Sequence, residues 1–81
     1  MLLGKMRKKN ITLKPAQVEE FVKAATKCDF DVDIYYNRYV VDAKSILGVF
    51  GLDLTKTLTV EYTGSDEQFE EYLKELAAAG W

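Results

Sequence analysis

The chain has 81 residues, of which 48% are hydrophobic and 30% are charged, and its formal net charge at pH 7 is -2. This length supports one domain with a single core, and an ordinary composition with periodic apolar positions excludes a disordered chain. We expect residues 1–81 to form a single domain. Residues 1–5 are expected to be a disordered or appended N-terminus, because strand-like alternation begins only near Met6.

The distribution of charge argues against nucleic acid as a partner. Residues 1–27 carry seven basic and two acidic side chains, whereas residues 28–81 carry four basic and eleven acidic ones. A nucleic-acid surface needs more basic residues with interleaved aromatics, and the acidic part would repel phosphate. There is no signal peptide and no apolar run of membrane-spanning length. We therefore expect a cytoplasmic protein that binds neither nucleic acid nor a membrane.

The N-terminal third predicts a strand followed by a helix. Alternation is clear at Ile11 and Leu13, and Pro15 suits the first turn of a helix. Apolar residues then recur at helical spacing and predict a core-facing stripe, formed by Val18, Phe21, Val22 and Ala25. Cys28 lies in phase with this stripe, so we expect a packed, inert thiol. As the only cysteine, it can form neither an intramolecular disulfide nor a thiolate metal cluster.

The next segment predicts a β-hairpin. From Phe30 the apolar period changes to two, Asn37-Arg38 supplies a turn in which Asn37 tolerates positive φ, and Tyr39 begins the returning strand. Aspartates at alternate positions resemble the opening of a calcium loop: Asp29, Asp31 and Asp33. The glycine and the distal glutamate that such a loop requires are missing at the required offsets. We therefore expect solvent-facing aspartates and no metal site.

The middle of the chain predicts a short helix with an unused apolar side. Ser45 precedes an apolar run that ends at Gly51, which is typical of a capped helix with a left-handed exit. On such a helix Val49 and Leu52 fall on one side. Because a surface helix buries only one side, the other side predicts a partner-facing patch. The residues of this candidate binding surface are Lys44, Ile46, Leu47 and Phe50.

The C-terminal third predicts a strand and a final helix. Residues 57–63 alternate in period two, and Gly64 breaks the strand. A capping-box pattern starts at Ser65 and opens the helix, which we expect to end at Gly80. The helical stripe consists of Phe69, Tyr72, Leu73 and Leu76. Trp81 either marks an interface or folds back onto the core. The element order is βαββαβα, which predicts two layers, with one face of the sheet open to water.

This order, together with one motif, resembles the HPr family, the histidine-containing phosphocarriers of the bacterial sugar phosphotransferase system. The motif is Ala-Lys-Ser-Ile-Leu-Gly at residues 43–48, which is similar to the family's regulatory-serine segment. The resemblance spans residues 6–79. It implies an α+β, open-faced β-sandwich with a four-stranded antiparallel sheet and three helices on one face. It also implies that Ser45 is a regulatory phosphorylation site for the family's dedicated kinase.

The family's other signature, a Gly-Leu-His-Thr-Arg-Pro-type loop before the first helix, is absent, and the sequence contains no histidine. Phosphorelay requires an imidazole that is nucleophilic near neutral pH and forms a labile phosphoramidate. Matching Pro15 to the family's proline puts Thr12 at the histidine's place and Lys14 at the arginine's place. Matching residues 21–23 instead puts Lys14 at the histidine's place. Under either alignment Thr12, Lys14 and Pro15 form a degenerate active-site loop.

The resemblance therefore implies an HPr-like protein that is related to the phosphotransferase system but not competent for histidine phosphotransfer. Triad catalysis is impossible without histidine and no glycine-rich phosphate loop exists, so we expect neither an enzyme nor a bound cofactor or metal. Two functions remain. One is a regulatory or adaptor protein that binds phosphotransferase-system or regulatory proteins, including a serine kinase, through the Ser45 helix. The other is a structural or small interaction domain with no remaining role in that system.

We favour the regulatory or adaptor function and a monomer. Drift under the constraint of the fold alone should replace exposed apolar residues on the short helix with polar ones. The sequence instead retains Ile46, Leu47 and Phe50.

Overall fold

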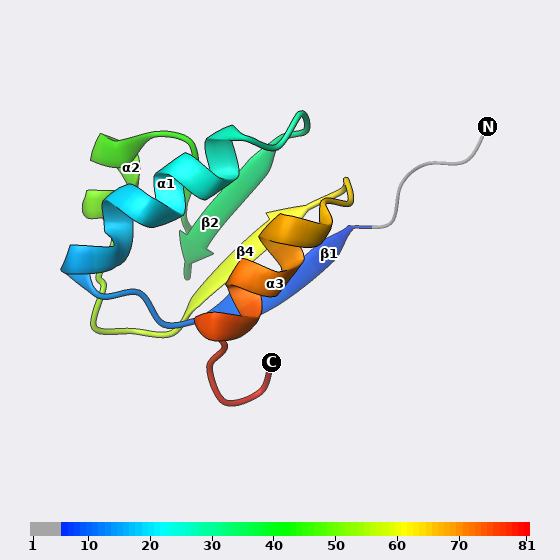
Figure 1. The fold of residues 1–81 in the computed structure, drawn as a ribbon. Helices are drawn as coiled ribbons and strands as arrows, with labels where there is room; N and C mark the ends of the chain where they lie inside the picture. The colour runs from blue at the N-terminus through cyan, green and yellow to red at the C-terminus, as the bar shows by residue number, and fades with distance from the viewer. Residues whose placement is uncertain (1–5) are drawn as a thin grey trace.

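The computed structural model describes residues 6–81, which form a four-stranded antiparallel sheet covered on one face by helices (Figure 1). The strands are β1 (Arg7–Ile11), β2 (Val32–Tyr36), β3 (Tyr39–Asp42) and β4 (Leu58–Tyr62), in the spatial order β1-β4-β2-β3. The helices are α1 (Val18–Thr26), α2 (Ile46–Phe50) and α3 (Glu67–Glu75), and a 3₁₀ turn, η1 (Pro15–Gln17), precedes α1. The predicted βαββαβα order and open-faced α+β fold are confirmed. The predicted N-terminal appendage, residues 1–5, lies outside the described residues.

The core lies between the sheet and the helices. Alternate residues of the two central strands are buried beneath the helices: Val32, Ile34, Leu58, Val60 and Tyr62. Three residues of the predicted α1 stripe are fully buried, and the fourth, Val22, packs at the edge of the core. Cys28 is buried as predicted, and burial raises the pKa of its thiol, with the charge of Asp66 adding to the effect. Sequence periodicity therefore identified the core side of each long element.

The open face of the sheet carries a row of carboxylates. Asp33 on β2 lies opposite Asp42 on β3 and opposite Glu61 on β4. Partial burial, followed by the charge of Asp42, raises the pKa of Asp33. Like charges directly opposite each other destabilise a sheet. Within residues 6–81 there is no group of three or more potential ligands with the geometry to hold a metal ion.

The turn inside the β2–β3 hairpin was predicted correctly, whereas the end of α2 was not. Asn37 has a φ of 56°, so the predicted positive-φ turn between β2 and β3 is confirmed. The left-handed exit at Gly51 is wrong, because its φ is -75° and its N–H still donates to the carbonyls of Leu47 and Gly48. The next residue, Leu52, donates its N–H to the Val49 carbonyl and is 7% exposed. The helix therefore ends without a left-handed residue.

The start of α3 differs by one residue from the prediction. Asp66, rather than Ser65, is the N-cap, and its Oδ1 accepts a hydrogen bond from the Phe69 N–H at 2.9 Å. The capping box predicted from Ser65 is therefore wrong. With Asp66 as the cap, Phe69 enters the core with its side chain 3% exposed. A carboxylate also interacts more favourably with the helix N-terminus than a hydroxyl does.

The end of α3 is also earlier than predicted, because the chain turns to pair with β1. The helix stops at Glu75 rather than continuing to Gly80. Ala77 forms a β-bridge with Ile11, and the N–H of Thr12 donates to the Leu76 carbonyl at 2.9 Å. Backbone groups that would have extended the helix thus bond to the edge strand instead. The helical spacing of the sequence could not show that these backbone groups would bond to β1 instead of extending the helix.

The C-terminal residue folds back onto the same edge. Gly80 has a φ of 87°, a conformation that favours glycine, and the following Trp81 N–H donates to the Ala78 carbonyl. The Lys9 ammonium lies 4.9 Å from the centre of the Trp81 ring. The Trp81 ring thus lies against Lys9 of the edge strand β1 and is 38% exposed, so the prediction that it folds back onto the core is wrong. That Trp81 marks an interface stays a prediction.

Candidate interaction site

The turn between β3 and α2 is held by its own short-range hydrogen bonds. Asp42 Oδ1 accepts from the Lys44 N–H at 2.8 Å, and the Asp42 carbonyl accepts from the Ser45 N–H at 2.9 Å. Ala43 is fully buried between them, and its N–H donates to the Val32 carbonyl. Such an aspartate turn followed by extended Ser45 sets the direction in which α2 leaves the sheet.

Ser45 is the N-cap of α2, as predicted. Its Oγ accepts a hydrogen bond from the Gly48 N–H at 3.1 Å, and its backbone is extended. The side chain is exposed, so the hydroxyl that caps the helix is also accessible to solvent. A structural role and accessibility to a modifying enzyme are therefore both compatible with this geometry.

Lys44 is more constrained than the sequence suggested. Its Nζ donates to the Cys28 carbonyl at 3.0 Å, and the residue is half-buried. This bond joins the start of α2 to the end of α1. The amine also contributes positive charge at the C-terminal end of α1, where the helix dipole favours a cation.

The outer side of α2 is apolar and exposed. Ile46 is 40% exposed, Leu47 83% and Phe50 49%, whereas Val49 and Leu52 on the inner side are at most 7% exposed. The predicted division of the helix into a buried and an exposed side is confirmed. We refer to Ile46, Leu47 and Phe50 as the α2 patch. Contiguous apolar side chains of this kind are typical of protein interaction surfaces.

Gly48 allows α2 to lie close to the sheet. A Cβ atom at this position would be 3.2 Å from the Ser45 Oγ and 3.2 Å from the Val41 Cβ. Both contacts are tighter than ordinary van der Waals packing. A glycine at this position therefore keeps the α2 cap and the β3 strand in contact.

The predicted degenerate loop lies at the start of η1. Thr12 and Lys14 are exposed, and Pro15 occupies the first position of the turn. The Lys14 N–H donates to the Gln17 side-chain oxygen at 2.9 Å, which fixes the loop without using the Lys14 amine. Within residues 6–81 no hydrogen bond or ion pair joins the side chains of this loop to the α2 patch. The loop presents a hydroxyl and an amine, and neither duplicates an imidazole.

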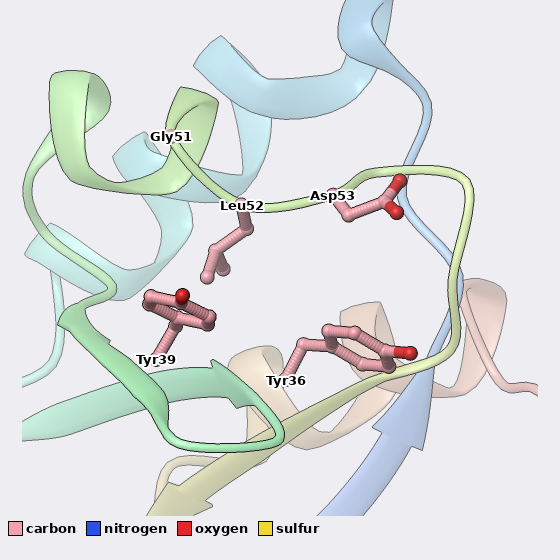
Figure 2. A pocket seen from close by; sticks show the side chains of 5 residues that line it. All are labelled: Tyr36, Tyr39, Gly51, Leu52 and Asp53. Atoms are coloured by element: carbon pink, nitrogen blue, oxygen red, sulfur yellow. The ribbon is translucent and has the colours of Figure 1, made fainter.

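Sequence reasoning missed a pocket between the hairpin and the segment after α2. It has a volume of about 280 Å³ and is lined by Tyr36, Tyr39, Gly51, Leu52 and Asp53 (Figure 2). We call it the tyrosine pocket. The available signal was the pair of tyrosines on either side of the Asn37 turn, which a two-residue hairpin places opposite each other.

Comparison with known proteins identifies the family. The family described as the PTS HPr component phosphorylation site matches residues 7–79 of this chain. The chain belongs to the HPr family. Two solved structures are similar to it: a phosphocarrier protein HPr from Bacillus anthracis str. Ames and HPr-C-His from Thermoanaerobacter tengcongensis.

Both similarities extend over most of each chain. The Bacillus anthracis protein is 26% identical with a TM-score of 0.69, over 90% of this chain and 98% of that one. The Thermoanaerobacter tengcongensis protein is 26% identical with a TM-score of 0.63, over 90% of each chain. HPr-family proteins are phosphocarriers rather than enzymes and act with proteins of the phosphotransferase system. Within residues 6–81 no helix has the length and apolar character needed to cross a membrane.

Proposed function

We propose that this protein is a regulatory or adaptor member of the HPr family, which binds protein partners through the α2 patch and does not carry phosphate on histidine. The exposure of Ile46, Leu47 and Phe50 is the observation that carries the proposal. Leaving three apolar side chains in water on a five-residue helix has no benefit for folding. A partner that covers them would gain the free energy of burying their apolar surface.

The absence of histidine supports the second part of the proposal. None of the 81 residues is a histidine, and the loop that would hold one presents Thr12 and Lys14. A threonine hydroxyl is a poor nucleophile without an adjacent base, and a lysine amine lacks the combination of properties that makes an imidazole a phosphocarrier. Neither replaces the imidazole of a phosphocarrier.

Ser45 supplies a means of regulating the patch. A phosphate on its exposed hydroxyl would place close to two negative charges at the N-terminal end of α2, which the helix dipole tolerates. Asp42 would oppose the phosphate and Lys44 would attract it. The dianion would lie beside Ile46 and Leu47, so it would alter the electrostatic match with a partner rather than unfold the domain.

Binding measurements test the patch directly. We would measure the affinity of the purified protein for the phosphotransferase-system proteins of its own organism by calorimetry, and compare Leu47→Glu with the wild type. Loss of at least about tenfold in affinity, or 1.4 kcal/mol, is expected for a residue at the centre of the interface. Val40→Glu is the matched control, because Val40 is 58% exposed but belongs to β3 at the sheet edge. Equal loss in both variants, or no binding by the wild type, would count against an adaptor function.

Phosphorylation is tested in two separate reactions. With labelled phosphoenolpyruvate and the first enzyme of the phosphotransferase system, we expect no acid-labile phosphate on this chain, while a histidine-containing carrier from the same reaction is labelled. With ATP and the family's kinase, we expect phosphate on Ser45 by mass spectrometry and none on Ser45→Ala. A wild-type chain that remains unmodified beside a modified carrier would leave Ser45 as a helix cap only.

A further inference from the structure

The tyrosine pocket is formed by two segments that meet across the end of the sheet. Tyr36 and Tyr39 are a directly opposed pair at the end of the β2–β3 hairpin. Gly51, Leu52 and Asp53 follow α2 and form the other wall, and Figure 2 shows both rings projecting from the hairpin toward this segment. The pocket is distinct from the α2 patch, whose residues do not line it.

The aromatic wall is open to a ligand. Tyr39 is 73% exposed, although a tyrosine has enough apolar surface to pack against its neighbours. Tyr36 is half-buried at the edge of the core, so its position is fixed while part of its ring lines the pocket. Aromatic faces carry a negative electrostatic potential, which attracts cations that come within about 6 Å of the ring centre.

The opposite wall carries a preorganised carboxylate. Asp53 Oδ1 accepts hydrogen bonds from the Thr55 hydroxyl at 2.6 Å and from the Thr55 N–H at 3.1 Å. These bonds lower the pKa of Asp53, and the charge of Lys56 contributes less. The carboxylate is therefore ionised at neutral pH. Both bonds use the same oxygen, and within residues 6–81 the second oxygen accepts no hydrogen bond.

No cation of the described residues, 6–81, fills this position. Within residues 6–81, Asp53 forms no ion pair, and neither Arg38 nor Lys56 lines the pocket. Pockets for drug-sized ligands measure roughly 300–1,000 Å³, so 280 Å³ suits one compact group rather than a large cofactor. Two tyrosine rings and an ionised carboxylate line the same small pocket, and this set of groups matches the chemistry of an organic cation.

We propose that the tyrosine pocket binds an organic cation, a guanidinium or a substituted ammonium group, between the rings of Tyr36 and Tyr39 and the carboxylate of Asp53. Leu52 closes the apolar side of the site and contacts the carbon atoms next to the charge. Such a cation can be a free small molecule or the side chain of a peptide. The site is partly exposed, so the dissociation constant should be on the order of a millimolar.

The test is a titration followed by the backbone amide signals of the full chain in NMR spectra. The probes are ethylguanidinium and choline, and the neutral control is 3,3-dimethylbutan-1-ol, which has the shape of choline without its charge. Saturable shifts at Tyr36, Tyr39, Gly51 and Leu52 are expected with the cations only. Equal affinity for the neutral alcohol would overturn the proposal, and so would the absence of any shift up to 50 mM cation.

Two variants separate the walls of the site. Tyr39→Leu should weaken binding by about threefold or more, and Asp53→Asn, which keeps an oxygen that can accept from Thr55, by about twofold or more. Glu67→Gln removes the same charge from α3 and should leave the affinity unchanged. If all three variants bind alike, or if Glu67→Gln weakens binding as much as Asp53→Asn, the cations follow the net charge of the protein and the proposal is wrong.

A second pair of probes identifies the source of the cation. We would compare a blocked Gly-Arg-Gly peptide with the same peptide containing citrulline, which keeps the shape of arginine but is neutral. If the arginine peptide binds at least tenfold more tightly than ethylguanidinium, the natural ligand is a protein side chain. If the arginine peptide and ethylguanidinium bind with equal affinity, the natural ligand is a free cation. An arginine peptide that binds no better than its citrulline counterpart contradicts recognition of charge.

Discussion

Replacing Ser45 with alanine tests how the start of α2 is stabilised. The substitution removes the side chain that accepts from the Gly48 N–H, a bond of 3.1 Å. Loss of a serine N-cap costs about 0.5–2 kcal/mol, with about 1 kcal/mol typical. Because the site is exposed and water can reach the freed N–H, we expect Ser45→Ala to lie in the middle of this range. For a domain of this size, 1 kcal/mol corresponds to a fall in Tm of about 4–8 °C.

The assay combines a global with a local measurement. Urea unfolding gives the change in the free energy of unfolding, and hydrogen exchange of the Gly48 amide reports the bond itself. Ser45→Asp retains an acceptor and adds a negative charge that the helix N-terminus favours, so we expect its stability to be within about 0.5 kcal/mol of the wild type. Its Gly48 amide should remain protected from exchange.

Ser65 supplies a matched control. This exposed serine also precedes a helix, but the cap of that helix is Asp66, so Ser65→Ala should change stability by less than about 0.5 kcal/mol. Two results would refute the reasoning. One is a loss below about 0.3 kcal/mol for Ser45→Ala together with unchanged exchange at Gly48. The other is an equal loss in Ser45→Ala and Ser65→Ala.

Three further predictions concern the sheet and the helix that covers it. Tyr62→Phe removes a 2.8 Å hydrogen bond to the Glu70 carboxylate and should lower the free energy of unfolding by about 1–2 kcal/mol. The buried Tyr72 hydroxyl lies near Glu20 but has no partner at full hydrogen-bond geometry within residues 6–81, so Tyr72→Phe should cost less than Tyr62→Phe in the same urea assay. Because the pKa of Asp33 is raised above 3.8, its ionisation opposes folding, and the free energy of unfolding should fall as pH rises through the raised pKa. Asp33→Asn should therefore raise the free energy of unfolding by about 0.2–1 kcal/mol at pH 7 and leave it unchanged near pH 3. A gain in stability at pH 3 would contradict this prediction. Gly64→Ala would place a Cβ atom in collision with the Phe30 ring and should cost about 1–3 kcal/mol. Most of this cost should disappear when Phe30→Leu is the starting protein.

The sequence by itself determined the element types, the core side of each long element and the division of α2. These features depend on local periodicity, because a residue's position on a helix or strand fixes the face to which its side chain points. For this reason the exposure of Leu47 and the burial of Val49 could both be predicted from spacing. The same local information identified Ser45 as a cap and Asn37 as the positive-φ residue of the hairpin turn.

Tertiary structure decided the features in which distant segments compete for the same groups. The chain left α3 at Glu75 because the backbone of residues 10–12 offered hydrogen bonds and a β-bridge to residues 76–78. The tyrosine pocket likewise exists only because the hairpin and the segment at Asp53 meet in space. Hydrogen bonds and burial between residues far apart in the chain leave no periodic signal, so only the folded structure shows which of them form.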